Sequence, residues 1–103
     1  MSYQNIISVG DTMLDYKRGI VKRDGQSAKL TPKETRLLYI LMKNAGQTVS
    51  RLDLIKGVWH QDHLKNQTNL DVHIHWLRLK VEPNPHIPEL IITRRGQGYE
   101  FLT

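Results

Sequence analysis

Hydrophobic and polar positions alternate in short runs over residues 6–30, a pattern typical of β-strands. The runs "IISV", "TMLDY", "GIVKR" and "SAKL" are separated by turn signals at Gly10, Gly19 and Gly25. Asp24 and Gly25 give a two-residue hairpin signal, because both residue types tolerate the positive φ angles of a type I′ turn. The pattern predicts a small antiparallel sheet of three or four strands.

The spacing of apolar residues changes at Thr31 from alternation to a helical period. "TPKE" supplies a hydroxyl N-cap, a proline at the first helical position and Glu34 to close a capping box. This pattern predicts a helix over residues 32–44, which Asn44, Ala45 and Gly46 end. Its apolar face consists of Leu37, Leu38, Leu41 and Met42.

A second, shorter helix is predicted after Ser50, because Asp53 follows three residues later and repeats the capping pattern. Residues 46–49 are then a tight connection between two helices, which is consistent with a helix-turn-helix arrangement. The sequence after this helix, residues 60–65, reads as a polar loop. The apolar side of the helix carries Leu54, Ile55, Val58 and Trp59.

A third helix is predicted over residues 66–81, before the stretch "EPNPHIPE", whose prolines cannot extend it. At about 100° per residue, one narrow sector of this helix is a core-facing stripe. That stripe consists of Leu70, Ile74, Leu77 and Val81. The opposite sector mixes polar and apolar side chains: Lys65, Thr68, Asn69, Val72, His75, Trp76 and Leu79.

The mixed sector allows two interpretations, because a purely solvated face would rarely carry a residue such as Trp76. One is that the helix is buried on both sides and Trp76 is part of the packing. The other is a contact surface. On DNA its apolar members could pack on thymine methyls and sugars, while its polar members hydrogen-bond base edges or phosphates. On a protein, Trp76 would be an anchor.

The C-terminal residues predict a β-hairpin, since "LIITRR" and "YEFLT" have β-branched and aromatic residues on either side of "GQG". Arg94 and Arg95 stand directly before Gly96, Gln97 and Gly98. The missing glycine side chains would let the backbone come close to a partner, and an arginine at a narrow tip suits the negative minor groove of DNA. The alternative is an ordinary glycine-rich turn flanked by solvated charges.

Composition narrows the classes of function. A chain of 103 residues is long enough for one core, so a single domain over residues 1–103 is expected. The net charge of +5 favours polyanionic partners, nucleic acid foremost. The absence of cysteine excludes disulfides and thiolate zinc sites. With no signal-peptide pattern and no apolar run near the roughly 18 residues that a membrane span needs, a cytoplasmic protein without a membrane segment is expected.

Catalytic and metal chemistry finds little support in the sequence. No nucleophile with its base, phosphate-binding glycine loop or acid pair is recognisable, so neither an enzyme nor a cofactor is predicted. His60 and His63 could share a loop site, and His73 lies near His75, but residues two positions apart on a helix face different directions. No metal site is therefore expected. A solvated basic face is expected from Lys17, Arg18, Lys22 and Arg23.

The stretches "LTPKETRLLYIL", "VSRLDLIKGVW", "LDVHIHWLRLKV" and "LIITRRGQGYEF" together resemble the OmpR/PhoB-type winged-helix DNA-binding domain. This domain is the output module of many bacterial two-component response regulators, and the resemblance covers essentially the whole chain. It implies an α+β winged helix-turn-helix fold with a four-stranded N-terminal antiparallel sheet, three helices and a C-terminal hairpin wing. The third helix would enter the major groove, with the wing at the adjacent minor groove.

The resemblance implies sequence-specific binding of double-stranded DNA by a bacterial transcription regulator. Arg78 and Lys80 would flank the reading face toward phosphates, and Arg95 would belong to the wing. Arg51 would contact the DNA backbone at the positive N-terminus of the second helix. The full set of expected DNA-binding residues is Arg51, Lys65, Thr68, Asn69, Val72, His75, Trp76, Arg78, Leu79, Lys80, Arg94 and Arg95.

The chain departs from this family pattern in its recognition helix. Family members commonly carry arginine or lysine at the positions of His75 and Trp76, and often arginine at that of Thr68. Three explanations are open: the target is read through apolar contacts and shape, affinity depends on the wing and a second protomer, or DNA binding has weakened. The competing class of function is a winged helix that binds protein through Val72, Trp76 and Leu79.

Further partners also follow from the resemblance. Two copies are expected to bind tandem or inverted half-sites as a dimer on DNA. The loop of residues 60–65 would contact RNA polymerase. The receiver domain that accepts the regulatory phosphate is absent from these residues. The chain is therefore an excised domain, a stand-alone regulator or the cytoplasmic end of a membrane-tethered activator.

Overall fold

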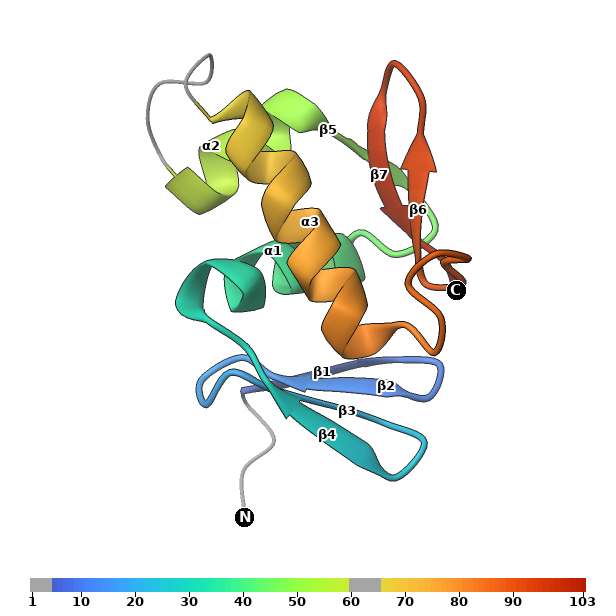
Figure 1. Ribbon diagram of the computed structural model, residues 1–103. Helices are drawn as coiled ribbons and strands as arrows, with labels where there is room; N and C mark the ends of the chain where they lie inside the picture. Colours follow the sequence, from blue (N-terminus) through green and yellow to red (C-terminus); the bar gives the residue numbers. More distant parts are fainter. Residues whose placement is uncertain (1–4, 60–65) are drawn as a thin grey trace.

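The N-terminal part of the computed structural model, which describes residues 5–59 and 66–103, is a four-stranded antiparallel sheet (Figure 1). The strands β1 (Ile6–Val9), β2 (Thr12–Asp15), β3 (Ile20–Arg23) and β4 (Gln26–Lys29) pair in chain order. Asp24 and Gly25 have φ angles of 52° and 76°, the left-handed pair that the hairpin turn requires. The predicted sheet and its hairpin turn are confirmed.

Three helices follow, α1 (Pro32–Lys43), α2 (Arg51–Trp59) and α3 (Gln67–Val81), each within one residue of its prediction. The capping box of α1 is complete: the Glu34 N–H donates to Thr31 Oγ1 (3.2 Å), and the Thr31 N–H donates to Glu34 Oε1 (2.9 Å). At α2 the Asp53 N–H donates to Ser50 Oγ (3.1 Å). Both predicted helix starts are confirmed.

Residues 46–49 are not a simple connection between helices, and here the prediction is wrong. They lead into β5 (Thr48–Ser50), which pairs with β7 (Gly98–Phe101), and β7 pairs with β6 (Ile91–Arg94) in a three-stranded sheet ordered β5-β7-β6. A Cβ at Gly98 would lie 1.9 Å from the Val49 carbonyl oxygen. The close approach predicted at Gly98 therefore brings β7 against β5 of the same chain.

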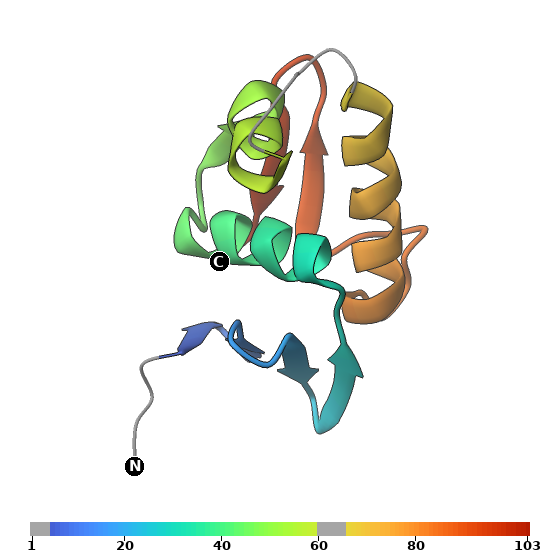
Figure 2. The same ribbon diagram turned by 90° about the vertical axis from the view of Figure 1, so that its left-hand side faces the viewer.

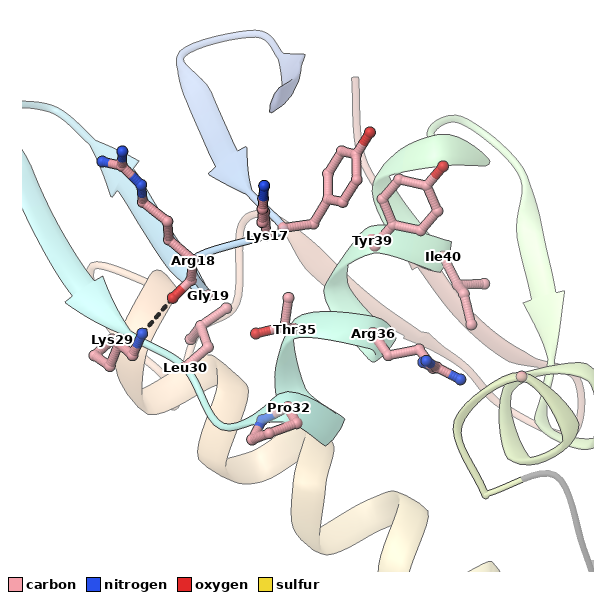
Figure 3. Close-up of a pocket in the computed structure, with 12 residues that line it drawn as sticks. Lys17, Arg18, Gly19, Lys29, Leu30, Pro32, Thr35, Arg36, Tyr39 and Ile40 are labelled. Carbon is pink, nitrogen blue, oxygen red and sulfur yellow. Dashed lines mark hydrogen bonds between the residues drawn. The ribbon is translucent and has the colours of Figure 1, made fainter. Parts of the chain in front are cut away.

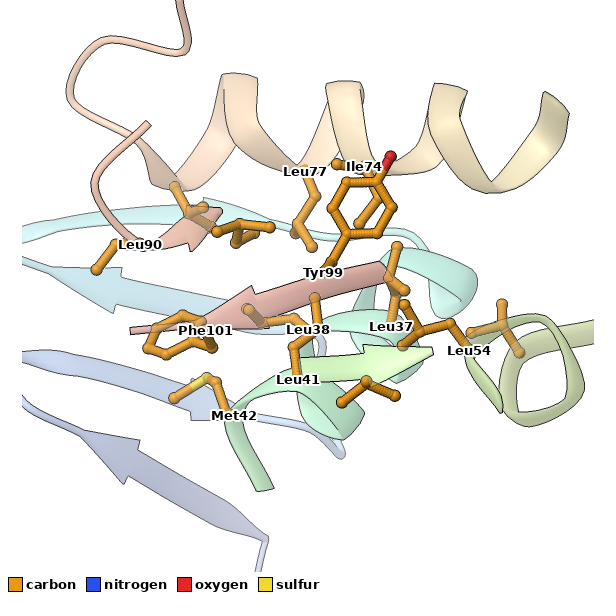
Figure 4. Packing of buried hydrophobic residues seen from close by; sticks show 14 of the residues in the cluster. Leu37, Leu38, Leu41, Met42, Leu54, Ile74, Leu77, Leu90, Tyr99 and Phe101 are labelled. Atoms are coloured by element: carbon orange, nitrogen blue, oxygen red, sulfur yellow. The ribbon is translucent and has the colours of Figure 1, made fainter. Parts of the chain in front are cut away.

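The central helix α1 lies between the N-terminal sheet on one side and α2 and the hairpin on the other, while α3 crosses beside α1 and its C-terminal end reaches the sheet (Figures 1 and 2). Leucines of α1 meet Ile74 and Leu77 of α3, Tyr99 and Phe101 of β7, and Leu54 of α2 in one cluster (Figure 4). The twelve core residues predicted from helical spacing are buried or packed against this cluster. Each helix therefore presents to the core the face that its periodicity indicates.

A buried carboxylate joins the end of α3 to the beginning of the hairpin. Glu82 directly follows α3 and is 7% exposed. Its Oε1 accepts from the backbone N–H of Glu89 (2.8 Å), its Oε2 accepts from that of Ile91 (2.8 Å), and the Leu90 N–H lies within 3.1 Å of both oxygens. Glu82 thus closes the loop before β6 and sets where the hairpin leaves α3.

Replacing Glu82 by alanine should lower the free energy of unfolding by about 3 kcal/mol, because three amides of a largely buried loop lose their acceptor. Urea unfolding followed by circular dichroism measures the loss. Glu89→Ala is the matched control, since it removes an exposed carboxylate from the same loop and should cost far less. Equal losses for the two variants would contradict the structural role of Glu82.

Candidate nucleic-acid interface

The face of α3 opposite its buried stripe is open to solvent. Trp76 is 45% exposed and Leu79 is 54% exposed, whereas Leu77 between them is fully buried. The expected polar members of this face, Thr68, Asn69 and His75, are exposed, and Val72 is half-buried. The interpretation that α3 is buried on both sides is therefore wrong, and the outward face is a surface available to a partner.

Trp76 is supported from the side by the ring of His73, which in turn meets the ring of Trp59 edge-on. The imidazole of His73 lies between the two indoles, with centroid distances of 5.1 Å to Trp59 of α2 and 5.0 Å to Trp76. The Nδ1 atom of His73 is 2.8 Å from the Asn69 carbonyl oxygen, which fixes the plane of the ring. In the sequence, His73 stands out only as a possible metal ligand near His75. Its spacing of three residues from Trp76 was the available signal for this contact.

A hydrogen-bonded ion pair connects α2, α3 and the hairpin. The two terminal nitrogens of Arg51 donate to the two carboxylate oxygens of Asp71 (2.6 and 3.2 Å), and its Nε donates to Gln67 Oε1 (2.9 Å). The hydroxyl of Tyr99 donates to the same carboxylate (2.8 Å). The guanidinium predicted to contact the DNA backbone is thus bonded to its own chain at a partly exposed site, where it links the N-terminal end of α3 to β7.

The hydrogen bonds among Arg51, Asp71 and Tyr99 shift the pKa of each of the three side chains. The hydrogen bond to Asp71 raises the pKa of Arg51. Burial alone would raise the pKa of Asp71, but the hydrogen bonds from Arg51 and Tyr99 outweigh it and lower that pKa below its ordinary value. Burial and the bond to Asp71 raise the pKa of Tyr99. At neutral pH Arg51 and Asp71 therefore form an ion pair, and the neutral phenol of Tyr99 donates a hydrogen bond to the Asp71 carboxylate.

Two other arginines of the predicted site are also bonded within the chain. The guanidinium of Arg78 donates to the Ile91 carbonyl oxygen (2.8 Å) and to Thr93 Oγ1 (2.9 Å), which ties α3 to β6. Arg94 pairs with Glu100 across the hairpin (2.9 Å). The guanidinium groups of Arg78 and Arg94 therefore each have a partner within the chain.

Lys80 reaches back from α3 to α1, where its Nζ lies 2.6 Å from Glu34 Oε1. The Glu34 side chain is only 2% exposed. Burial would raise the pKa of Glu34, yet the hydrogen bond and charge of Lys80, together with hydrogen bonds from Thr31, lower it. The Lys80 ammonium therefore neutralises the buried carboxylate that completes the capping box of α1.

Arg95 differs from these cations. It is exposed at the start of the hairpin turn, and within residues 5–59 and 66–103 the structure gives it no hydrogen bond or ion pair. Gly96 next to it has a φ of 75°, and a Cβ there would meet no atom within 4 Å, so the tip is open to a partner. Lys65, also predicted to bind DNA, lies outside the described residues, as does the whole loop of residues 60–65.

A solvated basic face is expected from Lys17, Arg18, Lys22 and Arg23, and for Arg23 this prediction is wrong. Its side chain is 19% exposed and its Nε lies 3.5 Å from Asp11 Oδ1, whereas the other three basic residues are exposed. In the described part of the chain no group of three or more histidines and carboxylates is placed to hold a metal ion. No described helix has the length and apolar character needed to cross a membrane.

The tip of the hairpin of β6 and β7 and the N-terminal end of α3 lie at the same end of the molecule (Figure 1). Arg51 at the start of α2 links them, because its backbone N–H donates to the Gln97 carbonyl oxygen (3.3 Å) and its Nε donates to Gln67 Oε1. An N-terminal four-stranded sheet, three helices and a C-terminal hairpin beside the third helix define a winged helix-turn-helix domain. The predicted α+β fold class is thus confirmed.

Comparison with known proteins shows which family of winged helix-turn-helix domains this chain resembles. The family model described as "Transcriptional regulatory protein, C terminal" matches residues 25–101. The sensory transduction protein RegX3 of Mycolicibacterium smegmatis is 37% identical over 96 residues, which cover 93% of this chain and 42% of that protein. The chain thus spans less than half the length of this curated relative.

Two solved structures share the fold. The DNA-binding domain of Klebsiella pneumoniae RstA, in complex with RstA box, superimposes with a TM-score of 0.84 at 29% identity, covering 96% of this chain and 98% of that one. DrrB, an OmpR/PhoB homologue from Thermotoga maritima, gives a TM-score of 0.83 at 29% identity, covering 96% and 45%. The chain belongs to the OmpR/PhoB-type family of transcriptional regulatory protein C-terminal domains.

The pKa of Asp71 predicts how the stability of the domain depends on pH. Because the folded-state pKa is lowered, the stabilisation by this carboxylate is present above the unfolded-state value of about 3.9 and is lost as pH falls through the folded-state pKa. Asp71→Asn should therefore cost roughly 1 kcal/mol or less at neutral pH, since solvent screens the half-exposed carboxylate.

Urea unfolding of the parent chain and Asp71→Asn at neutral and at acidic pH measures this dependence. The difference between the two proteins should shrink at acidic pH. Asp53→Asn is the control, because that carboxylate is exposed on α2 and no ion pair is seen for it in the described part of the chain. A difference for Asp71→Asn that persists unchanged below the folded-state pKa would contradict the ion-pair explanation.

Proposed function

We propose that this domain binds double-stranded DNA sequence-specifically and regulates transcription, with the outward face of α3 in the major groove and the hairpin of β6 and β7 as a wing at the adjacent minor groove. Membership of a family of transcriptional regulatory proteins supports the regulatory role. The similarity to a DNA-binding domain solved in complex with RstA box supports the DNA partner. No catalytic role is part of the proposal.

The observation that carries the proposal is the composition of the outward face of α3. Exposed apolar side chains, Trp76 and Leu79, alternate there with exposed hydrogen-bonding groups. Apolar groups can contact thymine methyls and sugars, and amide, hydroxyl and imidazole groups can read base edges. The proposed reading residues are Thr68, Asn69, Val72, His75, Trp76 and Leu79.

The cations of the predicted site divide into two roles under this proposal. Arg95 is exposed at the tip and would contact the minor groove or its phosphates directly. The four internally bonded cations would act by positioning α3 and the wing, and could share their remaining donors with phosphates. They are Arg51, Arg78, Lys80 and Arg94.

Other partners remain predictions from the family resemblance. Two copies would bind neighbouring half-sites, which increases the specificity of a small interface. Contact with RNA polymerase through residues 60–65, a receiver or sensor domain in a longer chain, and a cytoplasmic location where the DNA lies are further expectations. The competing function is capture of a protein by the apolar patch of Val72, Trp76 and Leu79.

Fluorescence anisotropy of a labelled duplex of mixed sequence, titrated with the domain at several salt concentrations, tests the DNA interface. Trp76→Ala should weaken binding about tenfold, as expected for loss of a buried aromatic contact. Arg95→Gln should weaken binding to all sequences and reduce the slope of log K against log salt by about one.

Matched controls lie on the N-terminal sheet. Met13→Ala removes an apolar side chain of similar exposure (41%), and Lys22→Gln removes one exposed positive charge. Both should bind DNA like the parent chain. Binding that survives Trp76→Ala and Arg95→Gln unchanged would exclude the proposed contact residues. No binding at low salt, together with self-association insensitive to salt, would favour the protein-binding alternative.

A further inference from the structure

A cavity of about 660 Å³ lies on a part of the domain that the proposed DNA interface does not use. It is open to solvent on one side and is bordered by the turn between β2 and β3, the end of β4, one side of α1, and Gly57 of α2 (Figure 3). None of its lining residues belongs to the outward face of α3 or to the wing. Its volume is in the range of sites that hold a small molecule.

One wall of the cavity is cationic. Lys17 and Arg18 come from the turn, and Lys29 comes from the end of β4. Among the described residues no carboxylate lines the cavity. Asp15, which does not line the cavity, accepts the backbone N–H groups of Lys17 (3.2 Å) and Arg18 (3.0 Å), and its Oδ2 lies 3.8 Å from Arg18 Nε, so it offsets one of the three charges. The wall therefore carries an excess of positive charge that suits an anion.

Hydrogen bonds hold the backbone of this cationic wall in place. The Gly19 N–H donates to the Asp15 carbonyl oxygen (2.8 Å), and the Leu30 N–H donates to the Gly19 carbonyl oxygen (2.7 Å). Gly19 has a φ of 68°, and a Cβ there would lie 3.1 Å from Thr35 Oγ1 at the start of α1. The Lys29 ammonium donates to the Arg18 carbonyl oxygen (Figure 3). The backbone that carries these cations is therefore fixed before any ligand arrives, and the Lys29 ammonium is anchored to it. The side chains of Lys17 and Arg18 are exposed and project from this backbone.

The opposite wall is apolar and aromatic. Tyr39 and Ile40 project from α1, and the Tyr39 ring is 4.8 Å from that of Tyr16 at a tilt of 55°. Leu30 and Pro32 contribute further apolar surface. A ligand that fills the cavity thus meets mainly apolar groups on the side of α1, where Arg36 also lines the cavity, and the cations Lys17, Arg18 and Lys29 on the other side.

We propose that this cavity binds a small organic anion with a flat apolar body, such as an aromatic carboxylate or sulfonate. The acid group would lie against Lys17, Arg18 and Lys29, and the apolar body against Tyr39 and Ile40. Charge complementarity and the size of the cavity carry the assignment. An acidic peptide would satisfy the cationic wall but has no flat body to fill the apolar side, so it is the less suitable occupant.

Two dyes that differ only in their acid group test this proposal. The probe 8-anilinonaphthalene-1-sulfonate has an aromatic body and one sulfonate, and N-phenyl-1-naphthylamine has the same body without the sulfonate. Fluorescence titration of the full chain should show saturable binding of the sulfonate at one site, about fivefold or more tighter than that of the neutral dye.

Substitutions then locate the site. Lys17→Gln combined with Lys29→Gln should weaken sulfonate binding about fivefold or more and leave DNA binding to the parent duplex unchanged. The matched control combines Lys22→Gln with Lys56→Gln, two exposed lysines that do not line the cavity, and should bind the dye like the parent chain. Melting curves establish that both variants are folded.

Three results would overturn the proposal: no saturable binding of the sulfonate, equal affinity for the two dyes, or equal weakening in both double variants. Binding of a glutamate-rich peptide in place of the sulfonate would also overturn it in favour of a peptide site. Because DNA binding is measured separately, failure of this proposal leaves the proposed function untouched.

Discussion

The ion pair between Arg51 and Asp71 is the interaction on which the geometry of the outer surface most depends. It joins the first residue of α2 to the second turn of α3, and the Tyr99 hydroxyl on the same carboxylate brings in β7. α2 and β7 are separated from α3 in the sequence, and neither forms a continuous ladder of backbone hydrogen bonds with it. Beside this contact, the apolar core and the bonds of Arg51 to Gln67 and Gln97 set how the N-terminal end of α3 lies beside the hairpin. Apolar packing is less directional than a bidentate charge-assisted hydrogen bond.

The same use of charge recurs at the other end of α3. Lys80 is bonded to Glu34 of α1, Arg78 to the Ile91 carbonyl oxygen, and Glu82 to the backbone of the following loop. The charged residues at this end of α3 therefore hold the helix in place on three sides. This arrangement leaves the outward face of α3 with few charges of its own, although the whole chain carries a net charge of +5.

Local signals made much of the fold predictable, and contacts between distant residues account for what was missed. The capping box at Thr31, the hairpin turn at Asp24 and the buried stripe of α3 each depend on residues within one or two turns of one another. β5 could not be found in this way, because three residues become a strand only by pairing with β7 at the far end of the chain. The outward face of α3 was predictable from its period. The bonding of Arg51, Arg78 and Lys80 was not, because a basic residue near a surface has the same sequence signature whether it faces a phosphate or a carboxylate of its own chain.

Under the proposed DNA interface, reading through apolar contacts and shape accounts best for the lack of basic residues on the outward face of α3. Trp76 is held by the His73 ring, which itself packs on Trp59 of α2, so the indole projects from the surface in a fixed orientation. A fixed aromatic side chain loses little conformational entropy when it binds, whereas a long basic side chain loses more. Long-range attraction can come from the net charge of the domain and from Arg95 at the wing, because electrostatic attraction to phosphates needs no particular base. Discrimination between sequences would then rest on the apolar and hydrogen-bonding groups of α3, and the cations beside that face would contribute by holding the helix at a constant angle to the wing.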